Sequence, residues 1–131
     1  MKREELIQTV SDVLGRYRAE ITAGYLFGSV AGGEVGALSD IDVAVLCSGS
    51  LDENTGDLRF RLYADLCRAL QRNDIDLVIL NTALNLVLKD EIVRNGILVH
   101  ETDTETREEF EVRVIHSCID FKRQRQRIVG V

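Results

Sequence analysis

Residues 25–46, with the sequence YLFGSVAGGEVGALSDIDVAVL, decide the fold that this chain is expected to adopt. Two apolar, strand-like runs enclose a glycine-rich turn, and two aspartates stand at the start of the second run. Gly28 and Ser29 follow the first run, ten residues intervene, and Asp40 and Asp42 come next. The pattern is GS-x10-DxD, and the hypothesis about function depends mainly on it.

Helical and strand-like patterns alternate on both sides of this stretch. Apolar residues recurring at three- and four-residue spacing predict helices over residues 3–18, about 57–71, 82–96 and 102 to about 127. Short apolar runs predict strands over residues 21–27, 41–47, 75–80 and 97–100. Polar residues 48–56 are expected to form a surface loop.

Three threonines stand where helix caps are expected. Thr55 and Thr82 precede the second and third helical patterns, and Thr102 with Glu105 forms a candidate capping box for the last one. Strands alternating with helices predict an α+β (α/β-like) domain spanning residues 1–131, with helices packed on a mixed sheet of about four strands.

Composition limits the classes of partner and compartment. A net charge of −6 argues against direct nucleic-acid binding, which requires clustered Lys and Arg, and suits a basic protein partner better. No apolar run approaches the roughly 20 residues of a membrane span, so no membrane partner is expected. The charged N-terminus predicts a cytoplasmic protein, in which three unevenly spaced cysteines are reduced thiols.

The two aspartates of the DxD pair predict a metal site. Alternate strand residues point to the same face and lie roughly 6.6 Å apart, so Asp40 and Asp42 project together. Two such carboxylates can share Mg²⁺ ions, and two ions can clamp the attacking and leaving oxygens of an in-line displacement. Asp76, in the third strand, is the best third carboxylate, either holding metal or accepting a proton, and Asp74 is its substitute.

The glycine turn predicts a phosphate site beside these carboxylates. Gly28 allows close backbone approach, Ser29 offers a hydroxyl, and a helix start would supply amide donors. Ser39 is a further candidate nucleotide-binding residue, which caps or orients the aspartates or merely ends the loop. His100 and His116 are isolated and read as core or partner-facing residues, while the basic residues 122–127 read as a solvated helix end or a contact to nucleotide or partner.

The segment FGSVAGGEVGALSDIDVAVL resembles the signature of the DNA polymerase β-like nucleotidyltransferase superfamily, and the short chain resembles its minimal members, the MNT antitoxins paired with HEPN toxins. The likeness extends to IDLVIL, NGILVH and IDFKRQR. It implies that Gly28 and Ser29 bind the triphosphate, that Asp40 and Asp42 hold Mg²⁺, and that Asp76 is the third carboxylate and base.

The resemblance also implies a reaction, the transfer of AMP from ATP to a tyrosine hydroxyl of a HEPN toxin. One departure counts against activity: Val30 and Gly32 stand where relatives often have arginines, as in GSRARG. A second hypothesis is therefore a module that neutralises its partner by binding alone, and a third is transfer to a small molecule such as an aminoglycoside. Homo- and hetero-oligomers both stay open.

Overall fold

The computed structural model describes residues 2–31, 40–49 and 54–128. A four-stranded sheet has the order β3-β2-β1-β4, with β1 (Ile21–Phe27), β2 (Ile41–Cys47), β3 (Ile75–Ile79) and β4 (Ile97–Glu101). β1 is antiparallel to β2 and β4, whereas β2 and β3 run parallel. The helices are α1 (Arg3–Gly15), α2 (Asn54–Leu70), α3 (Leu86–Asn95) and α4 (Thr104–Ile128). The expected mixed sheet with helices packed on it is confirmed.

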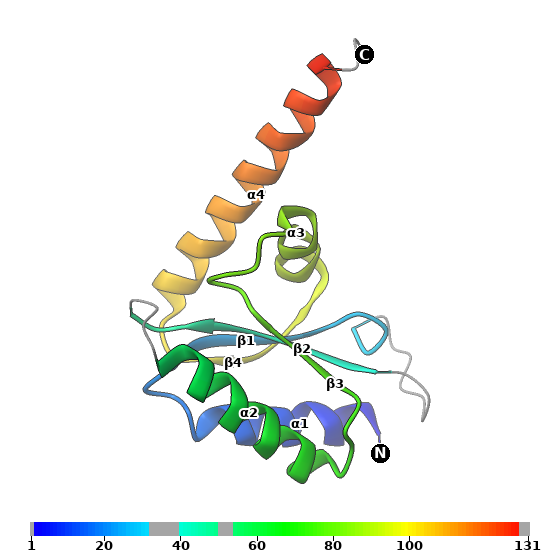
Figure 1. Cartoon of the computed structure of the whole chain (residues 1–131), viewed down its shortest axis with the longest axis vertical. Coiled ribbons are helices and arrows are strands. Elements are labelled where there is room, and N and C mark those ends of the chain that lie inside the picture. Colours follow the sequence, from blue (N-terminus) through cyan, green and yellow to red (C-terminus); the bar gives the residue numbers. More distant parts are fainter. Residues whose placement is uncertain (1, 32–39, 50–53, 129–131) are drawn as a thin grey trace.

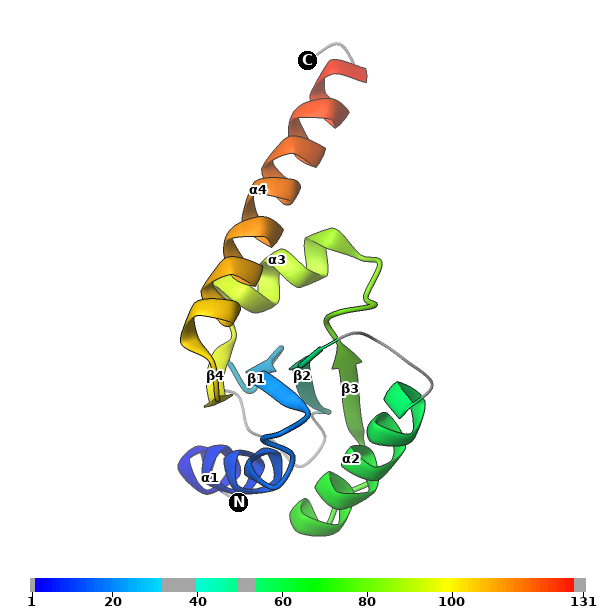
Figure 2. The same cartoon turned by 90° about the vertical axis from the view of Figure 1, so that its left-hand side faces the viewer.

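The helices form two layers, one on each face of the sheet. α1 and α2 cover one face, and α3 and α4 lie on the other (Figures 1 and 2). The second half of α4 extends well beyond the rest of the molecule (Figure 1). None of the helices within the described ranges is long and apolar enough to cross a membrane.

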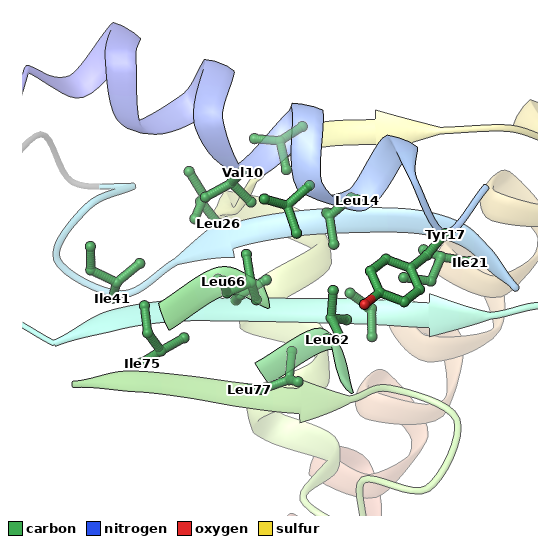
Figure 3. Close-up of a cluster of buried hydrophobic side chains, with 14 of the residues drawn as sticks. Val10, Leu14, Tyr17, Ile21, Leu26, Ile41, Leu62, Leu66, Ile75 and Leu77 are labelled. Carbon is green, nitrogen blue, oxygen red and sulfur yellow. The ribbon is translucent and has the colours of Figure 1, made fainter. Parts of the chain in front are cut away.

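The main apolar core lies between the sheet and the α1/α2 layer (Figure 3). Successive strand residues point to opposite faces, so alternate residues of β2, such as Ile41, Val43 and Val45, point into this core. α2 contributes one side chain per turn, because residues four apart share a helix face. These four residues are Leu58, Leu62, Leu66 and Leu70.

The opposite face has a smaller apolar cluster and a polar network that ties α4 to the sheet. Tyr25 of β1 is 2% exposed, and its hydroxyl donates a hydrogen bond of 2.7 Å to Glu111 of α4. Arg107 pairs with Glu111 at 2.8 Å and also with Glu101 at the end of β4. Burial and the hydrogen bond to Glu111 raise the pKa of Tyr25, so the phenol stays protonated and remains a donor.

Several helix boundaries differ from the sequence prediction. α1 ends at Gly15 instead of residue 18, and the chain turns through residues 16–20 before β1. Thr55 lies inside α2, which begins at Asn54, so Thr55 is not its cap. The apolar stripe of α2 starts only at Leu58, so periodicity did not reveal the polar first turn.

The two remaining caps were assigned to the wrong residues. Asn85, not Thr82, caps α3 by accepting a hydrogen bond of 3.0 Å from the Leu88 amide. At the start of α4, Asp103 accepts from the Thr106 amide at 3.1 Å. The Thr102 amide instead donates to the Thr22 carbonyl of β1, which continues the strand pairing past β4.

Candidate functional site

The register of the sheet places Asp42 directly opposite Asp76. These residues are Cα partners in the parallel pairing of β2 with β3, and Phe27, the last residue of β1, is the partner of Asp42 on the other side. Alternation along β2 directs Asp42 to the same face as Ala44, toward the α3/α4 layer. The start of β2 therefore presents carboxylates on the face opposite the main core.

The glycine turn contacts one of these carboxylates. Gly28 has a φ of +71°, which side-chain-bearing residues rarely adopt. A Cβ atom at Gly28 would lie 2.1 Å from Oδ2 of Asp42, closer than any non-bonded contact allows. Only glycine fits here, and the turn and the second aspartate of the DxD pair form one continuous surface.

The electrostatics of the three aspartates favour a cation. Burial, followed by the negative charges of Asp76 and Asp40, raises the pKa of Asp42. Asp40, immediately before β2, and Asp76 are exposed, whereas Asp42 is half-buried. Mutual repulsion of this kind is relieved by a bound metal ion, and carboxylate oxygens are the ligands that Mg²⁺ prefers.

The carboxylates alone do not form a finished metal cage. Among the described residues, no group of three or more His, Cys, Asp or Glu side chains is already arranged to hold a metal ion. Mg²⁺ commonly binds through one or two carboxylates and takes further ligands from water and substrate phosphates. The donor set therefore fits a metal that binds together with a phosphorylated substrate.

Asp74, the alternative third carboxylate, is held by a neighbour that the sequence analysis did not consider. Arg72 donates from Nε to Asp74 Oδ1 at 2.8 Å, and this hydrogen bond lowers the pKa of Asp74. The negative charge of Asp40 also acts on Arg72, so this cation lies at the edge of the carboxylate group. The two-residue spacing of Arg72 and Asp74 was the sequence feature that could have predicted this ion pair.

Of the two turn positions at which arginine was expected, Val30 and Gly32, the structure describes only Val30. Val30 is 1% exposed and belongs to the main core, so this position of the turn serves packing. A cation still lies nearby, since Arg3 of α1 donates to the Ala31 carbonyl at 3.5 Å. Ser29 is half-buried directly after Gly28. Residues 28–31 form a turn, without the helix start that was expected to follow Gly28 directly, and Ser39 and Gly32 lie outside the described residues.

The two histidines lie away from the aspartates. His100 is in β4, which β1 separates from β2, and burial lowers its pKa. Its imidazole has a hydrogen bond to the Ile21 backbone, but its Nε2 atom is buried without a partner among the described residues, so the core histidine that was one expectation is satisfied only in part. His116 is exposed on α4, as are residues 122–127.

Comparison with known proteins identifies relatives over most of the chain. Residues 8–105 match the family described as Polymerase beta, Nucleotidyltransferase. Protein adenylyltransferase MntA of Shewanella oneidensis is 36% identical over 105 residues, which are 80% of this chain and 71% of the relative.

Solved structures give the same result. A toxin-antitoxin structure with AMP-PNP matches with a TM-score of 0.75 and 31% identity over 95% of both chains. A complex of tri-AMPylated Shewanella oneidensis HEPN toxin with MNT antitoxin matches with a TM-score of 0.70 and 29% identity, covering 98% of this chain and 96% of the other.

Proposed function

Because this chain belongs to the polymerase β nucleotidyltransferase family, we propose that it is an antitoxin enzyme that transfers AMP from ATP to a tyrosine hydroxyl of a partner HEPN toxin. The observation that carries the proposal is the pairing of Asp42 with Asp76 across β2 and β3, against the Gly28 turn. The adenylyltransferase name of the MntA relative and the AMPylated HEPN toxin in a similar complex support AMP as the transferred group.

The glycine turn binds the triphosphate in this proposal. The left-handed backbone of Gly28 leaves no side chain between the turn and Asp42, so phosphate oxygens can approach both. Ser29 would donate its hydroxyl to the phosphates, and Ser39 remains a proposed contact. Arg3, beside the turn, is the cation available where relatives use turn arginines.

The three aspartates would hold Mg²⁺, and two ions fit the proposal. Asp40, Asp42 and Asp76 would supply the oxygen ligands. Burial and then repulsion by Asp76 and Asp40 raise the pKa of Asp42, and a divalent cation would remove the repulsion. When bound, Mg²⁺ neutralises charge on the phosphates during the displacement.

The protein's own contribution to the chemical step is positioning and proton removal. The acceptor hydroxyl transfers its proton to the carboxylate of Asp76 while its oxygen forms a bond to the α-phosphorus of ATP. The bond between the α-phosphorus and the bridging oxygen breaks, and pyrophosphate leaves with the electron pair. Asp76 fits the role of base because it is exposed, whereas Arg72 occupies Asp74.

The acceptor surface belongs to the partner. In this proposal, residues 1–131 act as a single minimal nucleotidyltransferase domain, and the toxin supplies the tyrosine and the surface around it. A cytoplasmic location is part of the same proposal, since ATP is the donor and the free thiols Cys47, Cys67 and Cys118 suit a reducing compartment.

Intact-mass spectrometry of the partner toxin tests the proposal. After incubation of the purified toxin with the chain, ATP and Mg²⁺, we expect the toxin to gain one or more AMP units, and peptide mapping should locate them on tyrosine. The matched control is the Asp40→Ala/Asp42→Ala variant, which should add none. An unmodified toxin in the wild-type reaction would refute the proposal.

A second function, neutralisation by binding alone, is favoured by one observation. Val30 packs in the core and offers no cation to the phosphates, and the absence of a basic contact at this position is what a weak or inactive enzyme would show. The same double variant distinguishes the two functions in a growth assay. Loss of neutralisation with retained toxin binding supports catalysis, whereas full neutralisation supports occlusion.

A further inference from the structure

The second half of α4 is an exposed helix whose surface the proposed reaction does not use. α4 runs from Thr104 to Ile128, and its first half packs beside α3 while its second half projects past the body (Figures 1 and 2). Val114 and Cys118 are its buried residues and mark the side that faces the body. The opposite side is open along the described length of the helix.

Charge is separated along this open side. The first half carries Glu105, Glu108 and Glu109, and the second half carries Lys122 and Arg123 with two further arginines. Arg113 in the first half and Asp120 in the second half are exposed exceptions to this pattern. Within the described part of the chain, Glu105, Glu109, Lys122 and Arg123 form no ion pair, and Glu108 has only a 3.7 Å contact with Arg107. Acidic and basic ends of one helix thus lack partners inside the molecule.

Between these ends lie two exposed apolar side chains. Val112 is 50% exposed and Ile119 is 38% exposed, and because they are seven residues apart they share a helix face. Val112, Arg113 and the three glutamates also line a surface hollow of about 490 Å³. An apolar centre flanked by opposite charges is suited to a second helix.

We propose that a second copy of this chain packs its α4 antiparallel against this face. An antiparallel two-fold arrangement places residues at equal distances from its midpoint opposite each other. The midpoint of Val112 and Ile119 falls between residues 115 and 116, so Val112 of each copy meets Ile119 of the other.

The same midpoint also matches the charges. Glu108 then lies across from Arg123, and Glu109 from Lys122, in both halves of the interface. A parallel arrangement would instead place glutamates beside glutamates and basic residues beside basic residues, which is unfavourable. The charge pattern therefore selects the antiparallel dimer of this chain over a parallel one.

Sedimentation velocity on the full-length chain without toxin tests the dimer. With rising concentration, the wild-type mass should approach twice 14.7 kDa, and added salt should weaken the association. Glu108→Lys/Glu109→Lys makes all four facing charged positions of each copy basic, and Lys122→Glu/Arg123→Glu makes them acidic, so each variant alone should be monomeric. An equimolar mixture of the two variants should recover the dimer, because opposite charges face each other again.

Control variants separate this surface from general effects on α4. Ile119→Asp should abolish the dimer, whereas Phe121→Asp, two residues along and on another side of the helix, should retain it. Circular dichroism should show all variants folded, since the changed side chains are exposed. A monomeric wild type, or charge variants that dimerise as well as wild type, would overturn the proposal. If the wild type is monomeric and the charge variants also lose toxin binding, the dimer proposal fails and the surface is assigned to the toxin instead.

Discussion

The two faces of the sheet differ in what their side chains do. Toward α1 and α2, the sheet buries one large apolar cluster that includes residues of all four strands. Toward α3 and α4, the cluster is smaller, and the sheet also presents Asp42 and Asp76. The partial burial of Asp42 and its repulsion by Asp76 and Asp40 oppose folding, so the apolar core on the α1/α2 face must offset this cost. Substitutions on the two faces should consequently change different properties.

Asp76→Asn should give the largest effect, and it acts on activity. Loss of the proposed base and metal ligand should slow AMP transfer by about 10²–10⁴-fold. Stability should hardly change, since Asp76 is exposed. The matched control is Asp74→Asn, which weakens the ion pair of this side chain with Arg72 and should slow transfer less than about tenfold. Single-turnover rates with toxin decide the point, and a larger loss for Asp74→Asn would reverse the assignment of the third carboxylate.

Leu66→Ala should give the largest effect on stability. Leu66 is 0% exposed in the main core, and such truncations cost about 2–5 kcal/mol of unfolding free energy. Transfer by the folded fraction should stay near the wild-type rate. Leu88→Ala, at the half-buried edge of the smaller cluster, should cost less in the same urea titration. An equal loss of unfolding free energy in both variants would contradict the proposed difference in stability between the two faces.

Gly28→Ala should affect both properties, because Gly28 links the turn to the site. The left-handed backbone costs a non-glycine residue roughly 1–2 kcal/mol, and the new methyl group would displace the Asp42 carboxylate. Gly15→Ala is the control, since a Cβ there meets no atom within 4 Å at the end of α1. The thermal unfolding temperature and the rate of AMP transfer should both fall for Gly28→Ala, and neither should fall for Gly15→Ala. Unchanged transfer would show that Asp42 tolerates displacement.

Asp42→Asn should give the smallest change in stability, and it should be a gain. Burial and the neighbouring aspartates raise the pKa of Asp42 in the folded state, so ionisation at neutral pH destabilises the fold. In the wild type, this loss of unfolding free energy develops as the pH rises from the ordinary pKa of aspartate through the raised pKa of Asp42. Asp42→Asn should therefore be the more stable protein at pH 7 and lose that advantage below about pH 4. Urea titrations at several pH values measure this, and an advantage that grows in acid would contradict it.

The sequence predicted the sheet and its carboxylates because both depend on strong local patterns. Apolar runs fixed all four strands to within one residue at either end, and the alternation of β2 placed Asp42 on one face. Helix ends were predicted less well. Asn85 and Asp103 took the capping roles expected of Thr82 and Thr102, because several polar residues near each start could accept the same amide hydrogen bond.

Other features depend on contacts between distant segments. Val30 is buried in the main core, which gathers residues of α1, α2 and the sheet, and no local pattern reveals this. The network of Tyr25, Glu111 and Arg107 joins residues up to 86 positions apart. The pairing of Asp42 with Asp76 depends on the parallel register of β2 and β3, which the local sequence patterns do not specify.

The most direct test of the separation between the two faces is the rate of AMP transfer to the toxin by Asp42→Asn, measured at equal folded concentration with the wild type. The predicted result is a loss of at least about 10²-fold from a protein that is folded and no less stable at pH 7, because a site carboxylate is gone while the main core is intact. A rate within a few-fold of wild type would contradict the account, since the chemistry would then not depend on the carboxylates of this face.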